Sequence, residues 1–330
     1  MKHIRLLTIP AVAAAAGVLS FAAAIGMGGP TAPPPMPSIN DPFKAVDFSQ
    51  LPPLRRYTAG DGAHLAYRYY PPGEPKAAGS VVLVHGSAAS SESMHVLAQA
   101  YARAGYAAYG LDMRGHGASG PKGHIAYIGQ LDDDLMQFMH AVAPPQPATL
   151  VGFSAGGGFA LRIAGSAQQQ MFQSYLLLSP FLGQDAPNYR PHSGGWINVG
   201  VPRVAAVSML NALGVHALDD LTVVRFALNE QAQRFLTPSY SFAMAANFRP
   251  RADYVATMRA VKEPCAVLAG AADEAFDTPQ LEAVVRSQRP DWPVALLPGI
   301  GHIPLTIDAR AVDAAVRATD SLRAKGAKGV

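Results

Sequence analysis

The chain has 330 residues, of which 49% are apolar and 15% are charged, and its net charge is +3. This length and composition suit one large domain with an insertion, or two small domains. The longest basic run is Arg55-Arg56, so we expect no nucleic-acid partner. A single cysteine, Cys265, excludes an intramolecular disulfide framework and a multi-cysteine metal site, and its apolar neighbours predict a buried thiol.

The N-terminus has the order of an export signal, with Lys2 and Arg5 ahead of the apolar residues 6–27. Ala22 and Ala24 form an A-x-A-like pattern, which resembles a signal-peptide cleavage site before Ile25. The stretch also has the length of about 20 residues that an uncleaved anchor needs. We therefore expect an exported, periplasmic or extracytoplasmic protein, either secreted or associated with the membrane through this segment. The alternative is an apolar helix packed on a cytosolic domain.

Changes in composition divide the chain into regions. Residues 1–28 are the expected signal peptide or signal anchor, and the proline-rich residues 29–55 predict an extended, poorly packed linker that acts as a spacer. Residues 56–180 and 251–330 carry the strand and helix patterns of a core. Between them, residues 181–250 show apolar stretches without strand runs, which predicts a helical cap over the site.

Strand and helix patterns alternate through the core, which predicts an α/β fold with right-handed crossovers and a mostly parallel sheet. The expected strands are residues 64–70, 81–84, 106–111, 148–153, 175–178, 266–270 and 293–297, and the expected helices are residues 91–104, 131–143, 279–288 and 308–324. The acidic run 132–134 at the start of one helix predicts a solvated face. Functional groups in such folds lie at the carboxyl ends of the strands.

Residues 149–165 predict a strand, a sharp turn and a helix, with Ser154 at the turn. A serine nucleophile on such a turn needs small neighbours, and Gly152 and Gly156 provide the space. The N–H of Ala155 would face a developing oxyanion from the start of the helix. A glycine-rich packing turn without chemistry is the alternative.

A serine nucleophile needs a base, and the base needs an anion that fixes its tautomer. Two later strand ends provide candidates, Asp273 after one strand and His302 in a glycine-rich loop after the next. Asp277 and Asp185 are alternative acids. We therefore expect a hydrogen-bonded chain of Ser154, His302 and Asp273.

The loop after the strand at 81–84 is the expected source of a second oxyanion donor. We predict the N–H of Ser87, with Ala88 as the neighbour that could replace it. His85 and His116 also lie in strand-end loops, but both precede the serine and have other plausible roles in their loops.

Five segments together resemble the α/β-hydrolase superfamily, and within it the lysophospholipase and monoacylglycerol-lipase-like group, in which an R-G-H-G-x-S loop is usual. The segments are VVLVHGSAAS at 81–90, LDMRGHGASG at 111–120, VGFSAGGG at 151–158, LAGAADEAFD at 268–277 and LPGIGHIPL at 297–305. The resemblance covers residues 57–324 except for the cap, which matches no pattern of the group. The substrate preference of the group therefore does not transfer with the resemblance.

The resemblance implies an α/β-hydrolase fold, with a mostly parallel sheet flanked by helices. To this the loss of strand runs in residues 181–250 adds the expected helical cap, inserted after the sixth strand. It implies Ser154 as nucleophile, Asp273 and His302 as its partners, and Ser87 and Ala155 as oxyanion donors. The chain order of serine, acid and histidine is the one expected of this superfamily.

A serine at the turn, where an aspartate would attack carbon, predicts acyl transfer through an acyl-enzyme on Ser154 and hydrolysis of a carboxylic ester. No P-loop, dinucleotide fingerprint or zinc motif occurs in the sequence, so we expect no cofactor and no metal. Apolar cap residues indicate an apolar acyl group or packing of the cap on the core; they are Met209, Leu210, Leu213 and Phe226.

Two rival functions remain from the sequence. A proline-iminopeptidase-like enzyme would share the serine chemistry and would hold a substrate amine with acidic cap residues, for which Asp185, Asp219, Asp220 and Glu230 are available. The other rival is an exported binding protein without enzymatic activity.

Overall fold

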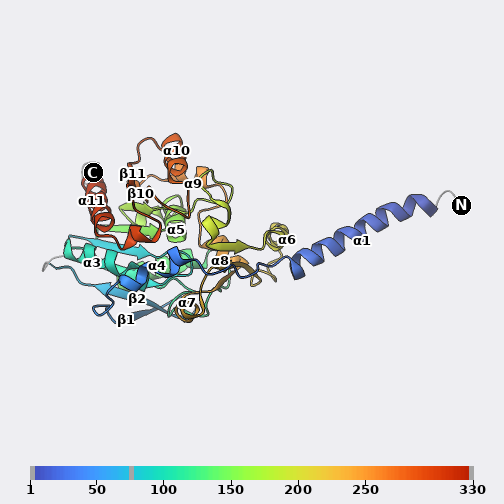
Figure 1. The fold of residues 1–330 in the computed structure, drawn as a ribbon, viewed down its shortest axis with the longest axis horizontal. Coiled ribbons are helices and arrows are strands. Elements are labelled where there is room, and N and C mark those ends of the chain that lie inside the picture. Colours follow the sequence, from blue (N-terminus) through green and yellow to red (C-terminus); the bar gives the residue numbers. More distant parts are fainter. Residues whose placement is uncertain (1–3, 74–77, 327–330) are drawn as a thin grey trace.

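The computed structural model describes residues 4–73 and 78–326 (Figure 1). An eight-stranded sheet forms the centre, in the order β1-β2-β4-β3-β5-β6-β10-β11. β1 and β2 are antiparallel to their neighbours, and the other pairs are parallel. The strands are β1 Leu54–Thr58, β2 His64–Tyr70, β3 Ser80–Val84, β4 Ala107–Leu111, β5 Ala148–Phe153, β6 Ser174–Leu178, β10 Cys265–Gly270 and β11 Val294–Leu297.

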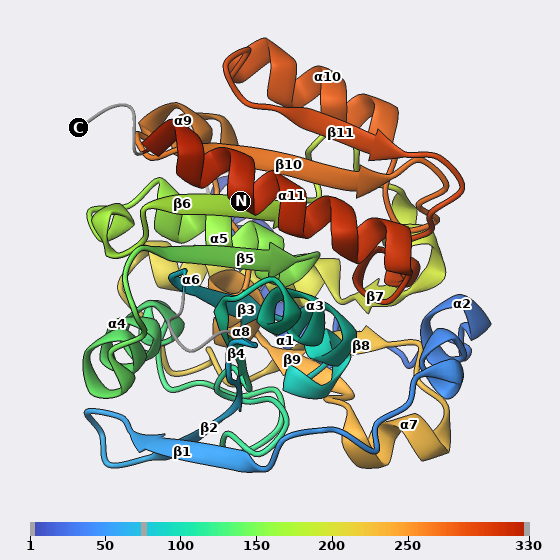
Figure 2. The same cartoon turned by 90° about the vertical axis from the view of Figure 1, so that its left-hand side faces the viewer.

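Helices cover both faces of this sheet (Figure 2). α3 and α11 pack together on one face, and α5 packs against β5 and β6 on the other. The core helices are α3 His95–Arg103, α4 Gln130–Val142, α5 Ala155–Ala164, α9 Tyr254–Ala260, α10 Thr278–Gln288 and α11 Ala309–Gly326. The predicted fold class, a mostly parallel sheet flanked by helices, is confirmed.

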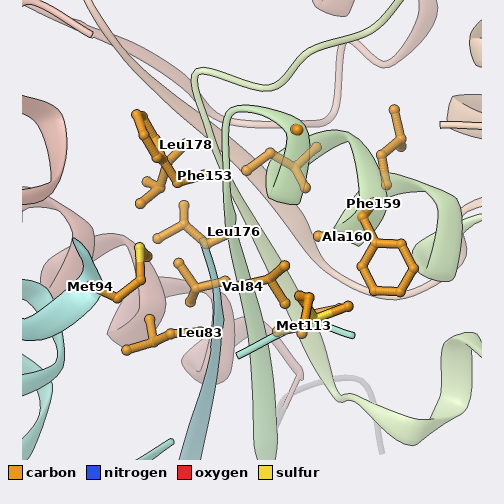
Figure 3. Close-up of a cluster of buried hydrophobic side chains, with 14 of the residues drawn as sticks. Leu83, Val84, Met94, Met113, Phe153, Phe159, Ala160, Leu176 and Leu178 are labelled. Carbon is orange, nitrogen blue, oxygen red and sulfur yellow. The ribbon is translucent and has the colours of Figure 1, made fainter. Parts of the chain in front are cut away.

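The core lies between the sheet and these two layers. Every residue of β3, β4, β5 and β6 is buried, which explains why their sequences are continuous apolar runs without alternation. Figure 3 shows part of this cluster, in which Leu83 lies close to Met94, and Phe159 lies beside Ala160 on α5. Cys265 is buried at the start of β10, as its apolar neighbours predict.

The insertion after β6 is only partly helical. It contains a three-stranded antiparallel sheet in the order β7-β8-β9, together with helices. Its elements are β7 Ile197–Val199, α6 Val201–Ala212, β8 Thr222–Phe226, α7 Glu230–Phe235, β9 Ser239–Ser241 and α8 Phe242–Asn247. The prediction that residues 181–250 lack strands was therefore wrong, because β7 and β9 are too short to show an alternating pattern.

The N-terminal region is α1, Ile4–Met27, which projects from the body of the molecule (Figure 1). Its end is attached to the insertion, since Arg203 on α6 donates hydrogen bonds to the carbonyl oxygens of Ile25 (2.8 Å) and Gly26 (3.1 Å). Within residues 4–73 and 78–326, no helix is both long and apolar enough to cross a membrane.

The proline-rich segment packs against the folded domain, in contrast with the expected spacer. Met36 N–H donates to the Ala227 carbonyl oxygen (3.2 Å), and Ile39 is buried. The segment forms a short helix, α2 Pro37–Asn40, and the 3-10 helix η1 Pro42–Ala45 before it enters β1. Leu54 and Arg55, expected in the linker, belong to this edge strand.

Candidate active site

Ser154 lies at the turn between β5 and α5 in a strained conformation, with φ 56° and ψ −117°. A Cβ atom at Gly152 would lie 2.1 Å from the carbonyl oxygen of Gly156, and one at Gly156 would lie 2.3 Å from that of His85. Only glycine fits at both positions. The turn thus holds the serine side chain clear of its own backbone, as the G-x-S-x-G pattern predicts.

A chain of hydrogen bonds links Ser154 to two residues distant in sequence. The Ser154 hydroxyl donates to Nε2 of His302 at 3.0 Å, and Nδ1–H of His302 donates to Oδ2 of Asp273 at 2.8 Å. Asp273 follows β10 and His302 follows β11, so both side chains lie at the carboxyl edge of the sheet with the serine. The alternative acids lie elsewhere, because Asp277 caps α10 and Asp185 is exposed.

The carboxylate of Asp273 is buried and well supported. Its Oδ1 accepts hydrogen bonds from the backbone N–H groups of Ala275 (2.8 Å) and Phe276 (2.9 Å). Burial alone would raise the pKa of Asp273, but the neighbouring His302 and these hydrogen bonds hold that pKa below its ordinary value. The group is therefore an anion at neutral pH and can support a positive imidazole.

The imidazole of His302 is fixed from several sides. The Phe153 and Phe276 rings lie 4.7 and 5.2 Å from it, measured between ring centroids. Its backbone N–H donates to Oε2 of Glu274 at 2.9 Å. This role of Glu274 was not predicted from the sequence, in which its position next to Asp273 is the one signal for it.

The two predicted oxyanion donors, Ser87 and Ala155, line the same cavity as Ser154 and His302. Ala88, the alternative donor, is already engaged. Its N–H donates to the Tyr240 hydroxyl at 2.7 Å, and its carbonyl oxygen accepts from Thr237 N–H at 2.8 Å. No acceptor among the described residues pairs with the N–H of Ser87, which therefore remains free to meet a developing oxyanion.

Two buried histidines form hydrogen bonds in and next to the loop that carries Ser87 and Ala88. Nδ1–H of His85 donates to the Gly86 carbonyl oxygen at 2.7 Å, and that of His116 donates to the Arg114 carbonyl oxygen at 3.1 Å. Nε2 of His116 then accepts from the Tyr240 hydroxyl at 2.6 Å. Burial lowers the pKa of both imidazoles, so both are neutral at physiological pH and serve as structural hydrogen-bonding groups.

The acidic run at the start of α4 is not the solvated face that the sequence suggested. Asp132 is buried and pairs with Arg162 of α5 at 2.8 Å, and Asp134 is buried and pairs with Arg114 at 2.7 Å. Burial raises the pKa of Asp134, although Arg114 opposes the shift. These carboxylates join the helix to its neighbours.

A cavity of about 460 Å³ opens above Ser154, within the size range of small-molecule sites. Its wall is mostly apolar and comes largely from the insertion, including Trp196, Ile197, Val199, Val204, Val223, Val224, Phe226 and Phe242. Of the four cap residues proposed to hold an acyl group, Phe226 lines the cavity, whereas Met209 and Leu213 are 61% and 78% exposed on and beside α6.

The charged groups in the cavity wall are arginines, namely Arg162, Arg249 and Arg251, and no described carboxylate lines the cavity. The acidic cap residues considered for binding an amine lie outside it. Asp219 pairs with His216, and Asp220 pairs with His124.

The fold, the turn at Ser154 and the hydrogen bonds from Ser154 through His302 to Asp273 together define an α/β-hydrolase. Residues 75–306 match the family described as serine aminopeptidase, S33 (Hydrolase_4), and the chain belongs to this family of the α/β-hydrolase superfamily.

Known proteins agree with this assignment. The chain is 35% identical over 102 residues to a monoacylglycerol lipase of Mycolicibacterium smegmatis, a match that spans 29% of this chain and 36% of that protein. Among solved structures, a soluble variant of monoglyceride lipase from Saccharomyces cerevisiae has a TM-score of 0.65 at 18% identity, and the match covers 86% of this chain and 98% of the yeast chain. A membrane phospholipase A has a TM-score of 0.57 at 18% identity, with 98% of this chain and 99% of that chain covered. At these identities the structural matches establish the fold.

Proposed function

We propose that the protein is a serine hydrolase that cleaves carboxylic esters through an acyl-enzyme on Ser154. The observation that carries this proposal is the hydrogen-bonded chain from Ser154 through His302 to Asp273 at the base of an apolar cavity. A serine hydroxyl with a positioned base and a fixed anion is the arrangement that activates a nucleophile for acyl transfer.

The chemistry follows from the positions of the protons. His302 Nε2 takes the hydroxyl proton while Ser154 Oγ attacks the ester carbonyl carbon, and the N–H groups of Ser87 and Ala155 receive the negative charge on the carbonyl oxygen. His302 then gives its proton to the departing alcohol. A water molecule, deprotonated by His302, attacks the acyl-enzyme and releases the acid. Asp273 remains ionised and holds Nδ1–H throughout.

The substrate class we propose is an ester with an apolar acyl chain, as in the lysophospholipase, monoacylglycerol-lipase and carboxylesterase group. The apolar cavity wall supports it, and so does the similarity to a monoacylglycerol lipase. Burial of apolar surface contributes about 25 cal/mol per Å², so each methylene that enters such a cavity adds about 0.8 kcal/mol of binding. Rates should therefore rise with chain length until the cavity is filled.

The test compares hydrolysis of p-nitrophenyl esters by the wild-type protein and Ser154→Ala, with Ser287→Ala on the exposed side of α10 as the matched serine control. We expect Ser154→Ala to lower kcat at least about 10⁴-fold, since the residual rate comes from binding and oxyanion donors alone. Equal rates from wild type and Ser154→Ala would refute the proposal and favour a binding protein without enzymatic activity.

A proline-iminopeptidase-like activity is the second candidate, because the family description names a serine aminopeptidase. Such an enzyme needs a group that holds the substrate's positive amine, whereas arginines are the charged residues in this cavity wall. We therefore expect an N-terminal-proline amide to be hydrolysed far more slowly than an ester of matched size. The opposite order would favour the peptidase.

For localisation we propose export, on the basis of the basic-then-apolar order of residues 2–27. N-terminal sequencing of the protein recovered from cell fractions tests it. A chain that retains its first residues and remains in the cytoplasmic fraction would contradict the proposal.

A further inference from the structure

The lining of the cavity carries positive charge that the proposed ester chemistry does not use. Arg162, Arg249 and Arg251 line it together with Gln184, whereas β7, β8 and α6 contribute mostly aliphatic and aromatic residues to the lining. The charge of Arg162 is already matched, because its Nε contacts both carboxylate oxygens of Asp132 at 2.8 and 2.9 Å. Among the residues that the structure describes, no carboxylate pairs with Arg249 or Arg251 in this way.

Arg249 is mostly buried, yet its guanidinium forms no ion pair within the part of the chain that the structure describes. Burial lowers its pKa, Arg162 lowers it further, and Asp185, which is exposed and not in ion-pair contact, opposes the shift. Arginine stays protonated even when its pKa falls, so a partly desolvated cation faces the cavity. Its lost hydration is restored only by an anionic or hydrogen-bonding ligand.

Arg249 lines the same cavity as the nucleophile Ser154, and its chain neighbour lies against α5. Pro250, next to Arg249, packs against Gly158, which is one turn from the serine. A charged group at Arg249 and an ester carbonyl at Ser154 can therefore belong to one small molecule.

We propose that Arg249, assisted by the exposed Arg251, forms an anion-binding subsite that takes a phosphate or carboxylate on the alcohol part of the ester. This inference rests on the proposed function, because it assigns the substrate class of the same site. The apolar wall receives the acyl chain, and the arginine side receives the charged leaving group. The favoured substrate is then an acidic acyl ester of the lysophosphatidate type, in preference to a neutral monoacylglycerol.

The arrangement has a physical basis in guanidinium geometry. Arginine binds phosphate and carboxylate through paired N–H donors, and such charge-assisted bonds are about twice as strong as neutral ones. Losing one such bond typically reduces affinity or kcat/KM by about 10- to 100-fold.

The kinetic experiment measures kcat/KM for three esters with the same acyl chain, 1-lauroylglycerol, its 3-phosphate and its hemisuccinate. We expect the wild type to prefer the two anionic esters, and Arg249→Gln to lower the ratio of anionic to neutral kcat/KM by about 10- to 100-fold. Arg234→Gln, an exposed arginine on α7 outside the cavity, is the control and should keep the wild-type ratio. An unchanged ratio in Arg249→Gln would overturn the proposal. Loss of preference for the phosphate alone, or for the hemisuccinate alone, identifies which anion the subsite takes.

A binding experiment keeps this inference separate from the proposed function. Titration of dodecyl phosphate and of dodecanol into Ser154→Ala, with and without Arg249→Gln, needs no turnover. Tighter binding of the phosphate that depends on Arg249 supports the subsite even if no ester is hydrolysed. Equal affinity for the two ligands, or phosphate binding unaffected by Arg249→Gln, would overturn the subsite and leave the serine chemistry untouched.

Discussion

The hydroxyl of Tyr240 on β9 connects the insertion to the loop that carries the proposed oxyanion donor. It accepts a hydrogen bond from Ala88 N–H and donates one to Nε2 of His116. Ala88 has φ 64°, a conformation that non-glycine residues rarely adopt, so outside support is needed to hold the loop in this shape. Ser87 is its direct neighbour. Tyr240→Phe removes both hydrogen bonds and keeps the ring.

The expected loss in free energy of unfolding follows from the two polar groups that Tyr240→Phe leaves without a hydrogen bond. Ala88 N–H and His116 Nε2 are both buried, and a buried polar group without a hydrogen bond costs about 1–3 kcal/mol. Packing against Phe226, at 4.7 Å between ring centroids, is kept. We therefore expect Tyr240→Phe to lower the free energy of unfolding by about 2–4 kcal/mol. Because one oxyanion donor contributes about 10²–10³ in rate, partial displacement of Ser87 N–H should lower kcat by about 10- to 100-fold with little change in KM.

Urea unfolding followed by circular dichroism gives the stability, and ester hydrolysis at saturating substrate gives kcat. The matched control is Tyr175→Phe, which removes another buried hydroxyl, one that donates to the Gln169 carbonyl oxygen at 2.6 Å away from the cavity. We expect it to cost stability and leave kcat unchanged. If Tyr240→Phe also leaves kcat unchanged, Tyr240 does not position the loop. A stability loss below about 0.5 kcal/mol would refute the buried network itself.

Two further predictions concern the carboxylate of Asp273 and the buried imidazoles of His85 and His116. Asp273→Asn should lower kcat by about 10³- to 10⁴-fold, because an amide no longer selects the Nδ1–H tautomer of His302. The control Asp277→Asn should keep the wild-type kcat. Comparable losses of kcat in both variants would contradict the assignment of Asp273 as the partner of His302. The buried His85 and His116 have pKa values below the ordinary 6.5, so their stabilisation is present above pH 6.5 and is lost as the unfolded chain takes up protons at lower pH. Between pH 6.5 and 5, His116→Gln should therefore reduce the slope of unfolding free energy by up to about 1.4 kcal/mol per pH unit. An unchanged slope measured by urea unfolding would refute this.

Strand patterns were enough to locate the residues proposed for chemistry. β5, β10 and β11 are parallel members of one sheet, so the loops that follow them meet at one edge whatever the details of packing. Ser154, Asp273 and His302 each follow one of these strands within a few residues. Their proximity could therefore be predicted without any knowledge of side-chain contacts.

Contacts that depend on tertiary packing could not be predicted from the sequence. The ion pair of Asp132 with Arg162 forms because α4 and α5 bring the two side chains together in the folded protein. A solvent-exposed helix start and one whose carboxylates form buried ion pairs can have the same acidic run in the sequence, so the pattern does not distinguish them. The link from Tyr240 to Ala88 spans 152 residues and leaves no local signal at all.

The strands β7 and β9 were not predicted from the sequence for a related reason. β7 and β9 have three residues each, and they exist because each pairs with β8 along its length. An alternating pattern needs four or more residues to be recognised. β8, in contrast, has the apolar run of a strand, but the helical patterns around it favoured a helical interpretation of the whole insertion.

The strands of the insertion also indicate how a substrate reaches Ser154. β9 and Thr237, two residues before it, are joined to core loops by backbone hydrogen bonds, from Thr237 N–H to the Ala88 carbonyl oxygen (2.8 Å) and from Ser241 N–H to that of Gly123 (2.9 Å). Lifting the insertion on this side would break these bonds and expose buried groups, at a cost of about 1–3 kcal/mol for each group left unpaired. Arg251, in contrast, is an exposed residue of the cavity lining, and none of the backbone hydrogen bonds named above involves it. We therefore expect an amphiphilic ester to enter acyl chain first past Arg251, so that its anionic group comes to rest where the cavity meets solvent.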